Sequence, residues 1–151
     1  LASIALCQLD KVERHRALRL RQVELYDAAV AELDGIDPVA RDSRDLHAHH
    51  LYPVRVDRDR AGGTRDDYRL ALADENIGTS VHFLPVHRLT AYRELFPDQP
   101  PLPVAERAGD ELLSLPLSPS CSATGSGSAP SSPTGLSSAV TRSSCPAPVT
   151  K

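Results

Sequence analysis

The chain has 151 residues, of which 40% are hydrophobic and 25% are charged, and its formal net charge is -3. This length fits one ordinary domain, and the composition is close to the average for globular proteins. The acidic balance gives no general attraction to nucleic acid or to acidic lipid, so neither partner is expected. No run of about eighteen apolar residues is present for a membrane span, and the first residues become charged too early for a signal peptide. We therefore expect a cytoplasmic protein.

The chain divides into two parts of different composition. Residues 1–117 carry nearly all the charges and the large aliphatic side chains, and we expect them to form the folded domain. In residues 118–151, serine, threonine, proline and glycine predominate, and only Arg142 and Lys151 are charged. Such a segment buries too little apolar surface to offset the entropy of ordering its backbone. The sequence predicts that residues 118–151 are disordered.

The first element is a long helix. Apolar residues recur at steps of three and four between Ala2 and Leu33, which is the period of an amphipathic helix. Gly35 supplies a stop, because glycine accepts the left-handed conformation that is common just past a helix end. A single helix over residues 1–34, straight or bent, would extend about 50 Å, more than a small domain needs for its own core. We therefore predict that it bridges two domains.

The pattern after this helix predicts the order β, α, β, α, β. The first strand covers residues 49–56, where Pro53 favours an edge or a bulge. Thr64 and Asp67 resemble the capping box of a helix over residues 65–76. The remaining features are a helix stop at Gly78, a strand at 79–84, a short helix at 90–96, a proline-rich loop at 97–103, a helix at 104–113 and a strand at 114–117. Helices packed against a small sheet give an α/β or α+β layered domain.

The residues with most chemical potential lie between Ile77 and Tyr92. This segment combines a strand end, a turn fixed by Pro85 and two imidazoles, His82 and His87. Loops at strand ends are common places for ligands. Taken singly, however, each histidine is more often a structural hydrogen-bonding residue than a functional one.

Four segments resemble the C-terminal region of the DegT/StrS-type family of PLP-dependent nucleotide-sugar aminotransferases, in the order that the family has them. They are the opening helix at 2–19, HLYPVR at 50–55, ENIGTSVHFLPVH at 75–87 and PVAERAGDELLSLPLSP at 103–119. Together they extend over about residues 1–119, and their order is far more specific than any single motif. The resemblance implies that residues 1–117 are the C-terminal small domain of a fold-type I aminotransferase.

The resemblance also implies a reaction and a site. The family transfers an amino group, usually from glutamate, to a keto sugar attached to a nucleotide, with pyridoxal phosphate (PLP) as the electron sink. It implies that His82, Phe83 and His87, with Tyr92 nearby, line the nucleotide-sugar side of the active site and orient the substrate. Phe83 stands where the family often has tyrosine, so no hydroxyl contact is expected there. A homodimer is implied for the parent enzyme.

Two features depart from the family. The chemistry requires a lysine in a built pocket, whereas this chain has only Lys11, on the exposed side of the first helix, and Lys151, at the end of the tail. We therefore expect the PLP domain to precede Leu1, no catalytic or cofactor-binding residue within the chain, and no activity of the chain alone. The tail lacks the family's final amphipathic helix, for which a shifted reading frame in a GC-rich gene is our hypothesis.

One alternative function remains open at this point: a non-catalytic α/β interaction module that docks on a partner through its long helix. A metal site is not expected. His49 and His50 would point to opposite faces of a strand, which separates them in any set with His47. The five-residue step from His82 to His87 is not the spacing of a helical ligand pair.

Overall fold

The computed structural model describes residues 2–42, 44 and 46–118. In chain order, the elements are α1 (Ala2–Leu9), α2 (Val12–Val30), β1 (Ile36–Pro38), β2 (Tyr52–Val56), α3 (Arg58–Ala61), α4 (Arg65–Asp74), the 3-10 helix η1 (Val86–Arg88), α5 (Thr90–Leu95), α6 (Pro103–Glu111) and β3 (Leu112–Leu115). Apart from Ser118, the expected disordered tail lies outside the described residues. Among the described helices, none combines the length and the apolar character needed to cross a membrane.

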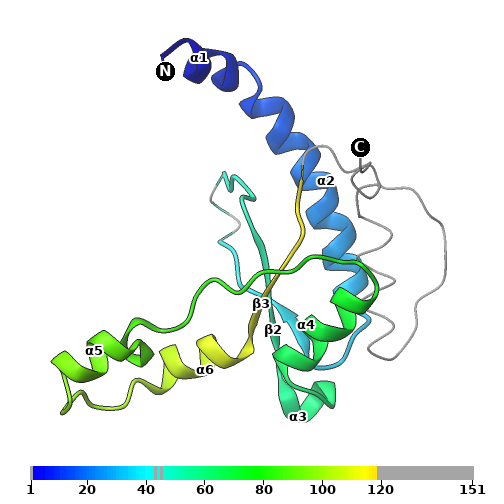
Figure 1. The fold of residues 1–151 in the computed structure, drawn as a ribbon. Helices are drawn as coiled ribbons and strands as arrows, with labels where there is room; N and C mark the ends of the chain where they lie inside the picture. The colour runs from blue at the N-terminus through cyan, green and yellow to red at the C-terminus, as the bar shows by residue number, and fades with distance from the viewer. Residues whose placement is uncertain (1, 43, 45, 119–151) are drawn as a thin grey trace.

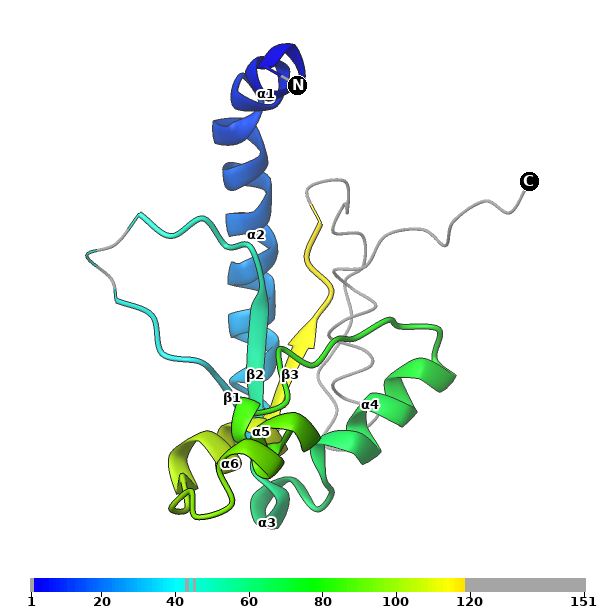
Figure 2. The same ribbon diagram turned by 60° about the vertical axis from the view of Figure 1, so that its left-hand side comes forward.

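A three-stranded antiparallel sheet in the order β1-β2-β3 forms the centre of the molecule. The helix α2 runs beside the sheet and carries α1 away from it, as Figures 1 and 2 show. The helices α5 and α6 project together on one side, while α3 and α4 leave the sheet on another. The layered helix-and-sheet class expected from the sequence is therefore confirmed.

The core lies where α2, the sheet and α4 meet. In β2, Tyr52, Val54 and Val56 are buried while the two residues between them are half-buried, which is the period-two pattern of a strand with one packed face. The residues of the core cluster are Val23, Tyr26, Val30, Ile36, Tyr52, Val54, Val56, Tyr68, Leu72, Ile77, Leu113 and Leu115. None of them comes from α1, α5 or α6, so these three helices are peripheral to the core.

The prediction of a single helix over residues 1–34 is wrong in one respect, because this segment contains two helices, α1 and α2. At the junction, the amide of Lys11 donates to the carbonyl of Gln8 at 3.0 Å, an i→i−3 contact that tightens the chain between α1 and α2. No residue of α1 is buried, so no packing of the described residues holds it in line with α2. The second helix ends at Val30, and Gly35 adopts the expected left-handed conformation, with φ of 76°, in the turn that follows.

The expected strand at residues 79–84 is also wrong. In this segment only Ser80 pairs, in an isolated bridge to Ser114, after which the chain leaves the sheet. The physical reason lies outside the segment: Pro85 packs directly against Gly109 of α6, which draws the chain away from β3. The sheet is completed instead by β1, in a segment for which no element is predicted from the sequence.

The position of Pro53 differs from the expectation of an edge or a bulge, because β2 is the central strand. Its carbonyl faces the β1 side, where it accepts a hydrogen bond from the amide of Val39 at 3.3 Å. An N–H at Pro53 would face the same side, toward Val39, which lies one residue beyond the end of β1 at Pro38. Its absence therefore removes no hydrogen bond between β1 and β2.

The later elements follow the sequence closely. Thr64 and Asp67 form the expected reciprocal capping box at the start of α4. This helix ends at Asp74, however, and the left-handed residue after it is Asn76, with φ of 60°, rather than Gly78. The expected helices at 90–96 and 104–113 are confirmed as α5 and α6, and the last strand is confirmed two residues earlier than expected, as β3.

Candidate functional site

Pro85 divides the candidate site into two parts. It follows the loop that carries His82 and Phe83, and it precedes η1, which carries His87. A methyl group at Gly109 of α6 would lie 2.4 Å from Cδ of Pro85, so the proline ring occupies the space that a side chain would need. The contact fixes where both parts stand relative to α6.

His82 is half-buried against β3. Its Nδ1 lies 2.9 Å from Oγ of Ser114, a residue of β3 that is only 5% exposed. The ring meets Phe83 edge to face, with 5.0 Å between centroids. The Phe83 side chain is 77% exposed, so this aromatic surface is open to contact.

His87 is anchored to the start of α6. Its Nε2 lies 3.3 Å from Oε1 of Glu106, and the same oxygen accepts a hydrogen bond from the amide of Leu102 at 3.0 Å. That backbone hydrogen bond, assisted by His87, holds the pKa of the Glu106 carboxyl below its ordinary value. Glu106 therefore stays ionised near neutral pH and fixes one nitrogen of the imidazole.

A cavity of about 460 Å³ lies between η1, α5 and α6. Its lining residues are Pro85, Val86, His87, Tyr92, Phe96, Gln99, Leu102 and Ala105. The rings of Tyr92 and Phe96 are stacked, with centroids 6.4 Å apart. Most of this lining is apolar, with few polar groups, and its volume is in the range of small-molecule sites.

The structure brings together two of the four residues expected at the site. His87 and Tyr92 line this cavity, whereas His82 and Phe83 lie on the other side of Pro85 and outside its lining. That all four form one substrate-facing wall stays a prediction.

Two further contributors were not anticipated from the sequence. Ser114 is the lone polar residue within an apolar strand, and this was a usable signal. Glu106 lies in the first turn of a helix that begins with Pro103, a place where an acidic residue commonly satisfies free amides.

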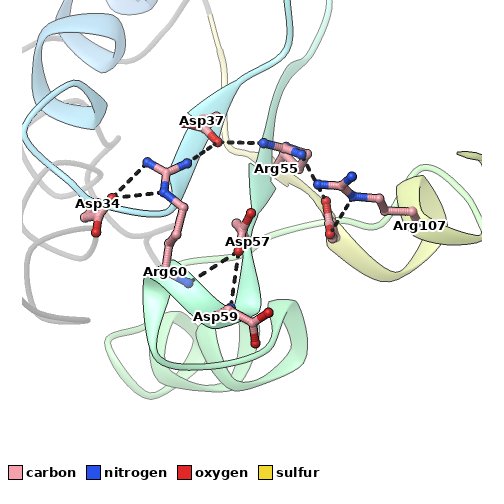
Figure 3. A network of polar contacts seen from close by, with 8 residues as sticks. Asp34, Asp37, Arg55, Asp57, Asp59, Arg60 and Arg107 are labelled. Carbon is pink, nitrogen blue, oxygen red and sulfur yellow. Dashed lines mark hydrogen bonds and ion pairs between the residues drawn. The ribbon is translucent and has the colours of Figure 1, made fainter.

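A chain of ion pairs connects the sheet with α3 and α6 (Figure 3). Its members are Asp34, Asp37, Arg55, Arg60, Arg107 and Glu111. Arg60 bridges Asp34 and Asp37, and Arg55 links Asp37 to Glu111 of α6. The hydrogen bond from Arg55 is the main cause that lowers the pKa of Asp37. Because each charge has a partner of opposite sign, we assign this network to holding α6 on the sheet.

The histidines before β2 form a contact of their own. The rings of His47 and His49 are 4.6 Å apart, and the amide of His49 donates to Nδ1 of His47 at 3.0 Å. Within the described ranges, no group of three or more histidine, cysteine, aspartate or glutamate side chains is placed to hold a metal ion.

The described residues do not fit the covalent attachment of PLP, which needs a lysine amine inside a pocket. Lys11 is the one lysine among them, and it is exposed at the N-terminus of α2. It does not line the cavity between η1, α5 and α6. Nor does it line a second cavity, of about 390 Å³, that lies beside Arg60. No chemical step through PLP is therefore assigned to these residues.

Several solved structures share this fold. DesI, solved in the presence of its TDP-sugar product, is 31% identical over 75% of this chain and 29% of its own, with a TM-score of 0.67. Spr1654 from Streptococcus pneumoniae, in its PLP-form, is 31% identical over 78% of this chain and 30% of its own, with a TM-score of 0.66. PseC, an aminotransferase of Helicobacter pylori, has a TM-score of 0.67 over 91% of this chain and 35% of its own, and at 21% identity it supports the fold alone. Spr1654 is described as a sugar aminotransferase, so the likeness to it points to the class of aminotransferases.

The particular family follows from the sequence match. The model of the DegT/DnrJ/EryC1/StrS aminotransferase family matches residues 1–125, and the chain belongs to this family. The chain spans about a third of the length of the solved proteins that it resembles.

Proposed function

We propose that residues 1–117 form the C-terminal small domain of a cytoplasmic PLP-dependent aminotransferase that transfers an amino group from glutamate to a nucleotide-linked keto sugar. The observation that carries this proposal is the family match over residues 1–125. The 31% identity to DesI, which was solved in the presence of its TDP-sugar product, supports the class of substrate.

In this proposal the chain supplies one wall of the active site. His87, fixed by Glu106, and Tyr92 contact the nucleotide sugar from the cavity between η1, α5 and α6. His82 and the exposed Phe83 contact it from the other side of Pro85. PLP supplies the electron sink for the reaction. The roles of these four side chains are orientation, hydrogen bonding and exclusion of water.

The PLP lysine and phosphate site belong, in this proposal, to another domain of the same polypeptide, and the parent enzyme is a homodimer. The position of Lys11 outside both cavities supports this division. So does α1, whose Ile4, Leu6 and Leu9 are each more than 60% exposed, because apolar side chains on a helix with no buried residue suit a contact with a further domain.

The test is made on the native polypeptide, purified with an antibody raised against this chain. Incubation with glutamate and a TDP-linked keto sugar should yield the TDP-amino sugar, and borohydride should trap PLP on a lysine outside residues 1–151. A polypeptide without reducible PLP and without amination would contradict the proposal. It would favour the alternative, a non-catalytic module that docks through α1 and α2.

The chain alone should behave differently. Mixed with PLP and borohydride, the 151-residue chain should give no adduct at one specific lysine by peptide mass spectrometry, because the amine of Lys11 has no surrounding pocket. A Lys11→Arg variant serves as the matched control for unspecific labelling. A stoichiometric adduct at Lys11 that this variant removes would overturn the division of roles.

A further inference from the structure

The contact between His82 and Ser114 joins the proposed substrate wall to the buried sheet. Ser114 lies opposite Pro53 in the pairing of β2 with β3. On its other side, its backbone amide and carbonyl exchange hydrogen bonds with Ser80 at 2.8 and 3.1 Å. The main chain of Ser114 is thus hydrogen-bonded to Ser80 on one side and faces Pro53 on the other, and its buried hydroxyl lies beside the ring of His82.

The hydroxyl proton of Ser114 determines which ring nitrogen of His82 is protonated. A hydroxyl carries one donor hydrogen and can also accept, whereas a neutral imidazole has one donor nitrogen and one acceptor nitrogen. Within residues 2–42, 44 and 46–118, Nδ1 of His82 is the one partner found for Oγ of Ser114. If Nδ1 carried the proton, the hydroxyl hydrogen would be left in a buried place without an acceptor, which is costly. If Nδ1 is the acceptor, both groups are satisfied.

We propose that Ser114 is a positioning residue that holds neutral His82 in the single tautomer with its proton on Nε2. The ring then presents an N–H donor on the side turned away from β3, next to the exposed ring of Phe83. A donor beside an aromatic surface suits an oxygen of a sugar hydroxyl or of a phosphate, with the sugar ring against Phe83. This last, functional part rests on the proposed function, whereas the tautomer does not.

The tautomer is read directly from the ring nitrogens. A long-range proton–nitrogen correlation spectrum of the nitrogen-15-labelled 151-residue chain, recorded above the titration range of histidine, separates a protonated ring nitrogen from an unprotonated one. His82→Gln assigns the His82 signals. His50, which is exposed and has no side-chain hydrogen bond among those described, should show the averaged shifts of a ring that exchanges between both tautomers.

Wild-type His82 should show an unprotonated Nδ1 and a protonated Nε2, with a larger shift separation than His50. Ser114→Ala should reduce that separation to the value of His50, and Ser114→Thr, which keeps the hydroxyl, should restore it. Ser80→Ala is the matched control, because Ser80 shares the backbone bridge with Ser114 while its side chain is exposed. It should leave the His82 signals unchanged.

Two results would overturn the proposal: a wild-type His82 that carries its proton on Nδ1, or one whose shifts equal those of His50. Both are read on the unmutated chain, so a Ser114 variant that fails to fold does not remove the test. In the native polypeptide, Ser114→Ala should lower kcat/KM for the nucleotide sugar on the order of tenfold, with Ser114→Thr recovering most of it. A polypeptide with no amination at all would contradict the proposed function and leave the tautomer result standing.

Discussion

At the scale of single residues, the tightest requirement is the absence of a side chain at Gly109. This glycine is buried in α6, and an added Cβ would come within 2.5 Å of both Cγ and Cδ of Pro85. A proline ring has no flexible end that could move aside, so either the loop before η1 or α6 itself must shift. The residue acts through the shape of the site and not through any chemistry of its own.

We expect Gly109→Ala to lower the free energy of unfolding by about 1–3 kcal/mol, the usual cost of overpacking. The change should also alter the amide signals of His87 and Tyr92, since both line the same cavity as Pro85. Urea unfolding and an amide correlation spectrum measure the two effects. Gly78→Ala is the matched control, because no atom lies within 4 Å of its added Cβ. Equal stability of the two variants would contradict the close contact.

His49 makes the stability of the chain depend on pH. It is 9% exposed and its φ is 47°, and burial, followed by the charge of His47, lowers its pKa from the ordinary 6.5. A lowered pKa means that the unfolded chain binds the proton more readily than the folded one in the window just below 6.5. The contribution of His49 to stability is therefore unchanged above this window and is lost as pH falls through it.

His49→Asn should flatten this part of the pH profile, since asparagine does not titrate and tolerates a positive φ. The measurement is the free energy of unfolding in urea at a series of pH values from neutral to mildly acidic. His50→Asn, at the exposed neighbouring position, should keep the wild-type slope. A wild-type profile with no fall in stability below pH 6.5 would rule out this role for His49.

At the scale of elements, the start of α4 depends on a capping box. The hydroxyl of Thr64 accepts from the amide of Asp67, and the carboxylate of Asp67 accepts from the amide of Thr64 at 2.8 Å. Because α4 contributes Tyr68 and Leu72 to the core, fraying of its first turn loosens packed residues as well as the helix.

Thr64→Ala should therefore cost about 1 kcal/mol of unfolding free energy, the typical value for a lost N-cap. Thr90→Ala is the control, since Thr90 begins α5 without any side-chain cap and with no buried residue in that helix. Both are compared by chemical denaturation. A Thr64→Ala variant as stable as Thr90→Ala would show that packing alone holds the first turn.

The elements that the sequence predicts correctly are those fixed by residues close together in the chain. The capping box and the helices α5 and α6 depend on residues close together in the chain, so local patterns were enough to find them. The segment at 79–84 has the composition of a strand, yet its path is decided by Gly109, which is distant in sequence. Likewise, β1 exists only because residues 54–56 pair with it, and its own Asp37 and Pro38 are poor strand residues.

The candidate site likewise combines residues that the sequence groups with residues that only the fold brings together. His87 and Tyr92 are five residues apart, and a resemblance in sequence was enough to group them. The cavity that they share needs Leu102 and Ala105, which the proline-rich loop returns to η1. The anchors Glu106 and Ser114 act across the fold on His87 and His82, and no local pattern connects them.

At the scale of the whole molecule, α1 lies outside the core yet carries large apolar side chains. The core cluster is confined to α2, the sheet, α4 and Ile77. Outside it, α1 and the start of α2 expose Ile4, Leu6, Leu9 and Val12, at 47–67% of each residue's surface. Large apolar side chains that stay in contact with water favour association. Since no residue of α1 is buried, substituting Ile4, Leu6 or Leu9 removes nothing from the core.

The 151-residue chain should consequently self-associate as its concentration rises, which sedimentation velocity measures. The double variant Leu6→Lys with Leu9→Lys should stay monomeric over a wider range, because two charges make an apolar contact along α1 unfavourable. Ala5→Lys with Gln8→Lys adds the same charge at two other exposed positions of α1 and should associate more nearly as the wild type does. If both double variants behave alike, net charge and not the leucines governs association. A wild-type chain that remains monomeric with a sharp cooperative melt would show that α1 needs no further contact.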